Sequence, residues 1–519
     1  MSAVNTVVAP ERFNASLLLD RNIEQGRAAK PAVHAVDRSL TYGELLVQAS
    51  RAGNLLRALG VAREERVLLV LDDTTAFPVV FLGAMRLGAV PVPVSPLDKA
   101  DNFRHFADDS YARVVVADAG CVPMLREALD GRDLTFVSAR GPADGAIDLE
   151  AELAKQHDEL PPAPTHRDDM AFWLYSSGST GRPKGVVHLH HDIDYTCETY
   201  ARQVLGVRED DVMYSTTKLQ HAYGLGNNLS FPFHVGATAV LNAGPPKPDA
   251  ILSVLRSRRP TIFFSVPALY GALVRVPDAE DAFASVRMCV SAAEALSPTI
   301  FDRFAERFGL EIVDGIGSTE MLHIFCSNVP GQVVRGSTGR PVPGYDLRIV
   351  DEDGSVLEGE AVGHLEVRGD SCAAFYWHQH EKTKASMRGD WFTTGDRYRR
   401  TADGVYVYEG RVDDMLKIGG LWVSPVDMEN ALMEHPLVHG VGVVGVTVDE
   451  VSRVAAYVIR GEGDVTDDEL AEELRAWCKA RLRRYEYPHV VKFVDDLPRT
   501  INGKVQRFRL RELGGAALT

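Results

Sequence analysis

Short apolar runs alternate with amphipathic stretches through the first two-thirds of the chain. Residues 66–71 (RVLLVL) predict a buried strand, residues 75–87 a helix that ends at Gly88, and residues 89–94 the next strand. Further strands are expected at residues 112–117, 237–241, 261–266, 288–291 and 311–313. This alternation predicts an α/β fold in which helices cover parallel sheets. Ligands then bind in loops at the carboxyl ends of the strands.

The pattern changes after about residue 340. Residues 342–350, 363–367 and 404–408 predict antiparallel strands, which form a small antiparallel β part of the same domain. We place a domain boundary near Gly410, which gives a large N-terminal domain (1–410) and a small α+β C-terminal domain (411–519). In the second domain we expect strands at 440–446 and 454–459. A long helix follows and begins at Thr466, which forms a T-x-x-E capping box with Glu469.

Composition narrows the function classes. The 519 residues carry a net charge of −16, from 56 basic and 72 acidic side chains, which argues against a general nucleic-acid binder. The apolar run 77–94 contains Arg86 and three prolines, so it predicts a helix and a strand rather than a membrane span. Residues 1–12 show no signal pattern. No CxxC pair occurs, so we expect the cysteines to be free thiols in a cytoplasmic protein; they are Cys121, Cys197, Cys289, Cys326, Cys372 and Cys478. We expect the protein to be a monomer or a homodimer.

A loop rich in glycine and hydroxyl groups follows the apolar run 170–175. Its N–H and hydroxyl groups suit phosphate oxygens, and glycine lets the backbone approach an anion. Lys184 adds a positive charge, but the spacing does not match an ordinary P-loop. The candidate phosphate-binding residues are Ser176, Ser177, Gly178, Ser179, Thr180, Gly181 and Lys184.

The order of residues in this loop (YSSGSTGRPKGVVH) resembles the signature of adenylate-forming enzymes, which include acyl-CoA synthetases, adenylation domains and luciferases. Four more segments resemble later motifs of that superfamily, in the same order. They are residues 314–320 (DGIGSTE), 394–396 (TGD), 410–417 (GRVDDMLK) and 497–504 (LPRTINGK).

The resemblance implies a role for each matching residue. Lys504 neutralises charge during adenylation, Thr319 binds phosphate, and Glu320 is the Mg²⁺ ligand; Mg²⁺ commonly uses one or two carboxylates plus phosphates. Asp396 binds the ribose with help from Arg411. The remaining implied ATP or AMP contacts are Ser291, Ala292, Ala293, Glu294, Asp314, Gly315 and Ile316.

The resemblance also implies domain rotation between two half-reactions. Asp413 matches the hinge about which the C-terminal domain turns. Lys417, Gly419 and Gly420 match the loop that then lines the thiol tunnel. The implied cofactors are ATP, Mg²⁺ and coenzyme A, or carrier-protein phosphopantetheine.

Two segments, residues 218–227 and 317–325, resemble benzoate–CoA ligases in particular. That resemblance places the aromatic acid among Ala222, Tyr223, Gly317, His323 and Ile324. Ala222 and Gly317 are small and leave room for a flat ring, and Tyr223 and Ile324 provide apolar surfaces on either side of it.

The chain also departs from those ligases. Gln220 and His221 stand where benzoate–CoA ligases carry aromatic residues, so we expect the substrate to be benzoate or a small substituted benzoate. The absence of aspartate between Gln220 and Gly226 disfavours an amino-acid substrate. For His188, His190 and His191 we favour a structural role over metal binding, because no second cluster with zinc spacing accompanies them.

The leading hypothesis is an AMP-forming aryl acid–thiol ligase that uses CoA, with no nucleic-acid or membrane partner. A close alternative transfers the aryl group to an acyl carrier protein, and the short segment 448–453 slightly favours it. Luciferase-like oxidation of an acyl-adenylate and an inactive binding module are the remaining alternatives. The retained Lys184, Glu320 and Lys504 argue against the last.

Overall fold

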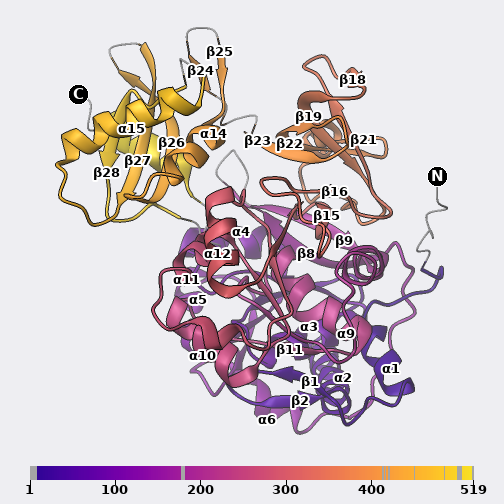
Figure 1. The fold of residues 1–519 in the computed structure, drawn as a ribbon. Coiled ribbons are helices and arrows are strands. Elements are labelled where there is room, and N and C mark those ends of the chain that lie inside the picture. The colour runs from indigo at the N-terminus through magenta and orange to yellow at the C-terminus, as the bar shows by residue number, and fades with distance from the viewer. Residues whose placement is uncertain are drawn as a thin grey trace.

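The computed structural model describes residues 9–176, 182–411, 414, 416–418, 421–448, 451–483, 486–499 and 505–516. The large body contains a nine-stranded sheet in the order β16-β15-β14-β13-β12-β10-β11-β1-β2. Figure 1 labels β16 and β15 towards one end of this sheet and β11, β1 and β2 towards the other. Neighbours from β14 to β1 pair in parallel. Its strands are β1 (Pro31–His34), β2 (Ser39–Thr41), β10 (Val212–Ser215), β11 (Thr238–Val240), β12 (Ile262–Ser265), β13 (Met288–Ser291), β14 (Ile312–Gly317), β15 (Ile324–Ser327) and β16 (Arg340–Pro341).

A second parallel sheet has the order β4-β3-β5-β6-β7, and a three-stranded antiparallel sheet has the order β20-β9-β8. The parallel strands are β3 (Arg66–Val70), β4 (Val90–Pro93), β5 (Val114–Asp118), β6 (Thr135–Ala139) and β7 (Ile147–Asp148). The antiparallel strands are β8 (Met170–Ser176), β9 (Lys184–Leu189) and β20 (Phe375–Tyr376). Trp173 of β8 is fully buried and packs with the core of the second sheet, so the two sheets share apolar contacts.

Helices cover these sheets, as the alternation of patterns predicted. Helices α2 and α3 cross closely at Gly83. A Cβ at this position would lie only 2.6 Å from the Ala49 carbonyl oxygen. The α-helices are α1 (Leu17–Glu24), α2 (Tyr42–Ala58), α3 (Ala76–Leu87), α4 (Ala100–Ser110), α5 (Val122–Ala128), α6 (Leu149–Leu153), α7 (His190–Thr196), α8 (Ala222–Leu225), α9 (Phe231–Val235), α10 (Pro248–Arg258), α11 (Pro267–Leu273) and α12 (Pro298–Phe308). Shorter elements are the 3₁₀ turns η1 (Ala119–Cys121) and η4 (Glu280–Phe283) and the π-helical turns η2 (Cys197–Arg202) and η3 (Gly226–Ser230).

The antiparallel part predicted after residue 340 is a separate sheet in the order β18-β17-β19-β22-β21, with β23 paired to β22. Its elements are β17 (Asp346–Val350), β18 (Val356–Leu357), β19 (Ala361–Arg368), α13 (His380–Ser386), β21 (Met387–Arg388), β22 (Trp391–Arg400) and β23 (Tyr406–Arg411). β23 continues one residue beyond Gly410, so Arg411 is still in this sheet. The domain boundary at Gly410 stays a prediction.

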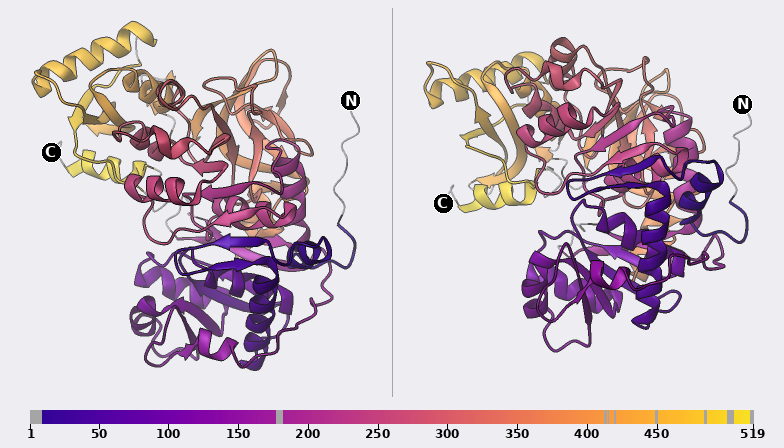
Figure 2. Two further views of the ribbon diagram at one scale, coloured as in Figure 1. Left: turned by 60° about the horizontal axis from the view of Figure 1, so that its bottom comes forward. Right: turned by 90° about the horizontal axis from the view of Figure 1, so that it is seen from below.

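The C-terminal elements lie against one side of the larger body in both views of Figure 2. Among them, α14 (Pro425–Met433) contacts α12. They enclose a core of their own, with Val443, Val458 and Leu470 fully buried. The predicted capping box is present, with Thr466 Oγ1 accepting from the Glu469 N–H. The elements are β24 (Leu416–Ile418), β25 (Leu421–Val423), α14 (Pro425–Met433), β26 (Val438–Val448), β27 (Val451–Arg460), α15 (Asp467–Arg481), β28 (Val490–Phe493) and α16 (Arg507–Ala516).

Two further expectations concern the whole chain. All six cysteines are free thiols. Within the described ranges, no helix is long and apolar enough to span a membrane, and the run 77–94 is α3 followed by β4.

Candidate active site

The predicted phosphate loop connects the two strands of the β8–β9 hairpin. Ser176 and Lys184 are the last paired residues on either side of it. Ser176 Oγ is buried without a hydrogen-bond partner in the described part of the chain, so it is available as a donor to a ligand. The loop residues Ser177, Gly178, Ser179, Thr180 and Gly181 lie outside the described residues.

Lys184 and Glu320 form a buried ion pair next to this loop. Lys184 Nζ lies 2.8 Å from Glu320 Oε1, and both residues are buried. The Tyr376 hydroxyl donates to the same oxygen at 2.8 Å. Burial alone would raise the pKa of Glu320, but Lys184 and Tyr376 hold that pKa below its usual value. The pair therefore joins the phosphate-loop lysine to the predicted metal ligand.

The turn that carries Thr319 and Glu320 is held by polar groups of neighbouring segments. His188 Nε2 donates to the Thr319 carbonyl oxygen at 2.7 Å, and His188 Nδ1 lies 2.7 Å from Asp192 Oδ2. Ser371 Oγ donates to the Met321 carbonyl oxygen at 2.9 Å. The backbone of this turn is thus held in one conformation.

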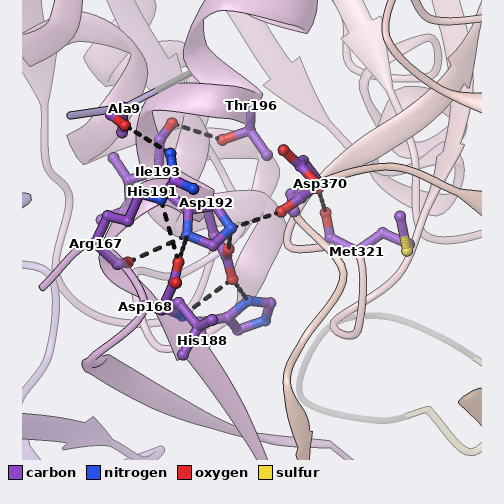
Figure 3. A network of polar contacts seen from close by, with 12 residues as sticks. Ala9, Arg167, Asp168, His188, His191, Asp192, Ile193, Thr196, Met321 and Asp370 are labelled. Carbon is purple, nitrogen blue, oxygen red and sulfur yellow. Dashed lines mark hydrogen bonds and ion pairs between the residues drawn. The ribbon is translucent and has the colours of Figure 1, made fainter. Parts of the chain in front are cut away.

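The other histidines of the H-x-H-H segment bind protein groups. His190 Nδ1 accepts the Ala15 N–H at 3.1 Å, and burial lowers the pKa of His190 to about 4. His191 lies 3.1 Å from the Arg167 carbonyl oxygen and 3.0 Å from that of Asp370 (Figure 3). The part of the chain that the structure describes holds no group of three or more side chains suited to a metal ion. These contacts agree with the structural role predicted for the segment.

The predicted adenine-binding residues come from adjacent parallel strands. Ser291 at the end of β13 pairs with Asp314 of β14, and Gly315 and Ile316 follow on that strand. Ala293 has a φ of +76°, a conformation uncommon for a residue with a side chain. Asp314 Oδ1 is buried without a hydrogen-bond partner among the residues described, and burial raises the pKa of Asp314 well above its usual value.

Asp396 and Arg411, predicted to bind the ribose, are directly opposite each other on β22 and β23. Arg411 Nη1 lies 3.0 Å from Asp396 Oδ1 and donates to the Thr394 carbonyl oxygen at 3.1 Å. Gly395 has a φ of +76°, and a Cβ there would meet Arg411 Nη2 at 2.9 Å. The positive φ favours glycine at this position, where the arginine packs against the backbone.

The structure also gathers the five residues of the predicted aryl site. Gly317 pairs with Ile324, and a Cβ on Gly317 would meet the His323 carbonyl oxygen at 2.5 Å. The ring centres of Tyr223 and His323 are 5.4 Å apart, and Ala222 precedes Tyr223 in α8. Burial lowers the pKa of His323 to about 3, so its ring is neutral at physiological pH.

Several predicted residues belong to the C-terminal part. Lys504, Asp413, Gly419 and Gly420 lie outside the described residues, and Lys417 is described only by its backbone pairing in β24. The Val505 N–H donates to Glu294 Oε1 at 3.1 Å. The residue after Lys504 therefore contacts the predicted adenine segment.

Comparisons with known proteins show the family of the chain. The family model described as "AMP-binding enzyme" matches residues 19–377, and "AMP-binding enzyme C-terminal domain" matches residues 427–504. The chain belongs to the AMP-binding enzyme family. This AMP-binding enzyme is 44% identical to the benzoate–CoA ligase of Thauera aromatica, over 97% of this chain and 96% of that protein. It is 42% identical to the 4-hydroxybenzoate–CoA/benzoate–CoA ligase of Rhodopseudomonas palustris, over 98% and 96% of the two chains.

Two solved structures of CoA ligases have the same fold as this AMP-binding enzyme. A benzoate CoA ligase from Burkholderia xenovorans matches with a TM-score of 0.91 and 44% identity, over 96% of this chain and 100% of that chain. An anthranilate CoA ligase in complex with anthranoyl-AMP matches with a TM-score of 0.94 and 36% identity, over 98% of both chains. The predicted fold class, a large α/β N-terminal part with a smaller C-terminal domain, is confirmed.

Sequence reasoning missed two residues that contact the candidate site of this AMP-binding enzyme. Tyr376 contacts Glu320, and Asn227 Oδ1 lies 3.2 Å from His323 Nε2. Asn227 belongs to the π-helical turn η3, a type of element frequent at functional sites. A glycine precedes it because a Cβ on Gly226 would meet His323 Cδ2 at 2.3 Å. No local pattern in the sequence predicted these contacts.

We predict that Asp314→Asn raises the thermal unfolding temperature at pH 8. Because burial raises the pKa of Asp314, folding favours its protonated form. The stability from this group is complete below the unfolded pKa of about 3.9 and is lost as the pH rises. Asparagine stays uncharged, so the gap between variant and wild type should narrow from pH 8 to pH 5 in scanning fluorimetry. The exposed control Asp130→Asn should show no such gap. An equal gap for Asp314→Asn at both pH values would contradict this account.

Proposed function

We propose that this enzyme converts benzoate or a small substituted benzoate to its aryl-adenylate with ATP and transfers the aryl group to CoA. The products are the aryl thioester, AMP and pyrophosphate. The observation that carries the proposal is the assembly of Ala222, Tyr223, Gly317, His323 and Ile324 around the turn that leads to Thr319 and Glu320. Apolar walls and a neutral histidine suit an uncharged ring. Similarity to benzoate–CoA ligases over nearly the whole chain supports the same substrate class.

The residues near the phosphates supply positioning and charge. Lys184 and Ser176 donate to the phosphate oxygens, and Thr319 adds a further donor. Lys504 neutralises the charge that develops when the carboxylate oxygen bonds to the α-phosphorus and pyrophosphate leaves. Such preorganised donors usually contribute most of the rate enhancement. The acid and nucleotide are held in line, so little reorganisation is needed.

Glu320 is the residue that would hold Mg²⁺. Glu320 offers a hard carboxylate oxygen beside the predicted phosphate loop, the kind of ligand that Mg²⁺ prefers, and phosphate oxygens and water would supply the other ligands. When bound, the ion neutralises charge on the leaving pyrophosphate.

The nucleoside is held by two other groups. Asp396 accepts from the ribose hydroxyls, with Arg411 fixing the carboxylate. Asp314 Oδ1 is a buried acceptor suited to the adenine amino group. Ser291, Ala292, Ala293, Glu294, Gly315 and Ile316 line the base.

The C-terminal residues serve the second half-reaction. The chain turns at Asp413, and the loop of Lys417, Gly419 and Gly420 lines the path of the thiol. The thiol sulfur bonds to the acyl carbon, its proton goes to solvent or a nearby base, and AMP leaves. The contact of Val505 with Glu294 supports assignment of the present pose to the adenylation step.

A carrier-protein thiol is the second candidate acceptor. Within the segment at residues 448–453, Val448 at the end of β26 pairs with Val451 at the start of β27. We expect CoA to support thioester formation at a kcat/KM at least about tenfold above that of a holo acyl carrier protein, a difference of about 1.4 kcal/mol in transition-state stabilisation. Mass spectrometry of both products distinguishes the acceptors. Acylation of the carrier at the higher rate would reverse the assignment.

Benzoate-dependent exchange of pyrophosphate into ATP tests the adenylation step. We expect exchange with benzoate and its small ring-substituted forms, and none with α-amino acids. Lys504→Ala should reduce exchange by about 10²–10³-fold, as removal of a preorganised donor does. Lys492→Ala on β28 is the matched control and should exchange normally. Near-normal exchange by Lys504→Ala would refute its role.

A further inference from the structure

Tyr376 contacts both members of the buried ion pair. It is 3% exposed, and its hydroxyl donates to Glu320 Oε1 at 2.8 Å. Lys184 Nζ lies 3.8 Å from the centre of the Tyr376 ring. Ammonium groups at this distance are attracted by the negative face of an aromatic ring. One side chain thus interacts with a cation through its ring and with an anion through its hydroxyl.

The backbone around Tyr376 fixes this side chain relative to both partners. Tyr376 pairs with Val186, two residues after Lys184 on β9. The Ala373 N–H donates to the Glu320 carbonyl oxygen at 2.7 Å, and the Tyr376 N–H donates to Thr383 Oγ1 at 3.0 Å. The segment is therefore bonded to the strand that carries the lysine and to the turn that carries the glutamate.

The charges define which way the hydrogen bond runs. The Tyr376 hydroxyl is the donor of this hydrogen bond, because the oxygens of an ionised carboxylate can only accept. The ammonium has three protons, and the contact with Glu320 uses one of them. Phosphate oxygens can accept the others while the ring continues to face the cation.

We propose that Tyr376 is a positioning residue for ATP. It holds the Lys184 ammonium and the Glu320 carboxylate in the positions from which they bind the phosphate end of the nucleotide. This inference rests on the proposed function, because it assigns Lys184 and Glu320 to phosphate binding. It adds a residue that acts through both of them.

Packing is the competing role for Tyr376. Its ring belongs to a small buried cluster with Val186 and Ala373. Tyr376→Phe keeps the ring and nearly the same volume, so a packing role predicts a variant that behaves as the wild type. A positioning role predicts a specific loss of ATP binding.

The test measures ATP affinity by calorimetry and the KM for ATP and for benzoate in pyrophosphate exchange. Hydrogen bonds to charged groups contribute about 1.5–3 kcal/mol, so Tyr376→Phe should weaken ATP binding about 10- to 100-fold. The KM for benzoate should change less than about twofold, since Tyr376 acts on the phosphate side. Tyr376→Leu, which also removes the ring, should weaken ATP binding more than Tyr376→Phe does.

Tyr406→Phe is the matched control. Tyr406 is equally buried, at 3% exposed, and its hydroxyl donates to the Leu347 carbonyl oxygen at 3.2 Å within the antiparallel sheet. This variant should bind ATP as the wild type does. If Tyr406→Phe lost as much ATP affinity as Tyr376→Phe, the removal of any buried hydroxyl would explain the effect, and the proposal would be overturned.

A double-mutant cycle tests whether Tyr376 acts through Glu320. In a Glu320→Ala background, adding Tyr376→Phe should weaken ATP binding by less than about twofold. Unchanged ATP affinity in Tyr376→Phe, an equal rise in the KM for benzoate, or the full loss in the Glu320→Ala background would each overturn the proposal. If the wild type shows no benzoate-dependent exchange, the proposed function fails, and the calorimetric ATP affinities still decide the role of Tyr376.

Discussion

The buried ion pair of Lys184 and Glu320 is the constraint on which the candidate site depends. Removing two charges from water is costly, and their attraction offsets that cost only when further hydrogen bonds satisfy them. Here the Tyr376 hydroxyl supplies such a bond, and the Ala373 N–H fixes the backbone of Glu320. Loss of one partner from a buried pair typically costs about 3–5 kcal/mol, since the other charge stays buried. The β8–β9 hairpin and the turn after β14 are therefore held together by electrostatics.

Topology brings the remaining groups to this pair. The carboxyl ends of β13 and β14 place Ser291 beside Asp314, and the antiparallel β22 and β23 place Asp396 opposite Arg411. The C-terminal part contacts the same region through Val505. Three separate sheets and the C-terminal part therefore contribute residues to the candidate site.

Much of the fold could be predicted because its strands are buried on both faces. Continuous apolar runs then mark them, as at residues 66–71 and 288–291, where strands occur. The capping box at Thr466 is a local signal and was also predicted correctly. The site residues were predicted from their resemblance to known motifs. The structure gathers the described ones without testing their roles.

The contacts that escaped prediction depend on distant strand pairing. Tyr376 reaches Lys184 and Glu320 only because β20 pairs with β9, although the two strands are far apart in sequence. His188 was assigned a structural role, and its bond to the Thr319 carbonyl connects it to the turn that carries Thr319 and Glu320. The π-helical turn at Gly226–Ser230 leaves no local signature, because tertiary packing around His323 sets it.

The most direct test of the account follows oxygen from benzoate labelled with ¹⁸O in its carboxylate. If the carboxylate oxygen bonds to the α-phosphorus and the thiol later displaces AMP, one labelled oxygen is transferred to AMP. Mass spectrometry of the products from ATP, labelled benzoate and CoA should therefore show one ¹⁸O in AMP and none in pyrophosphate. Unlabelled AMP, or label in pyrophosphate or phosphate, would contradict an aryl-adenylate intermediate.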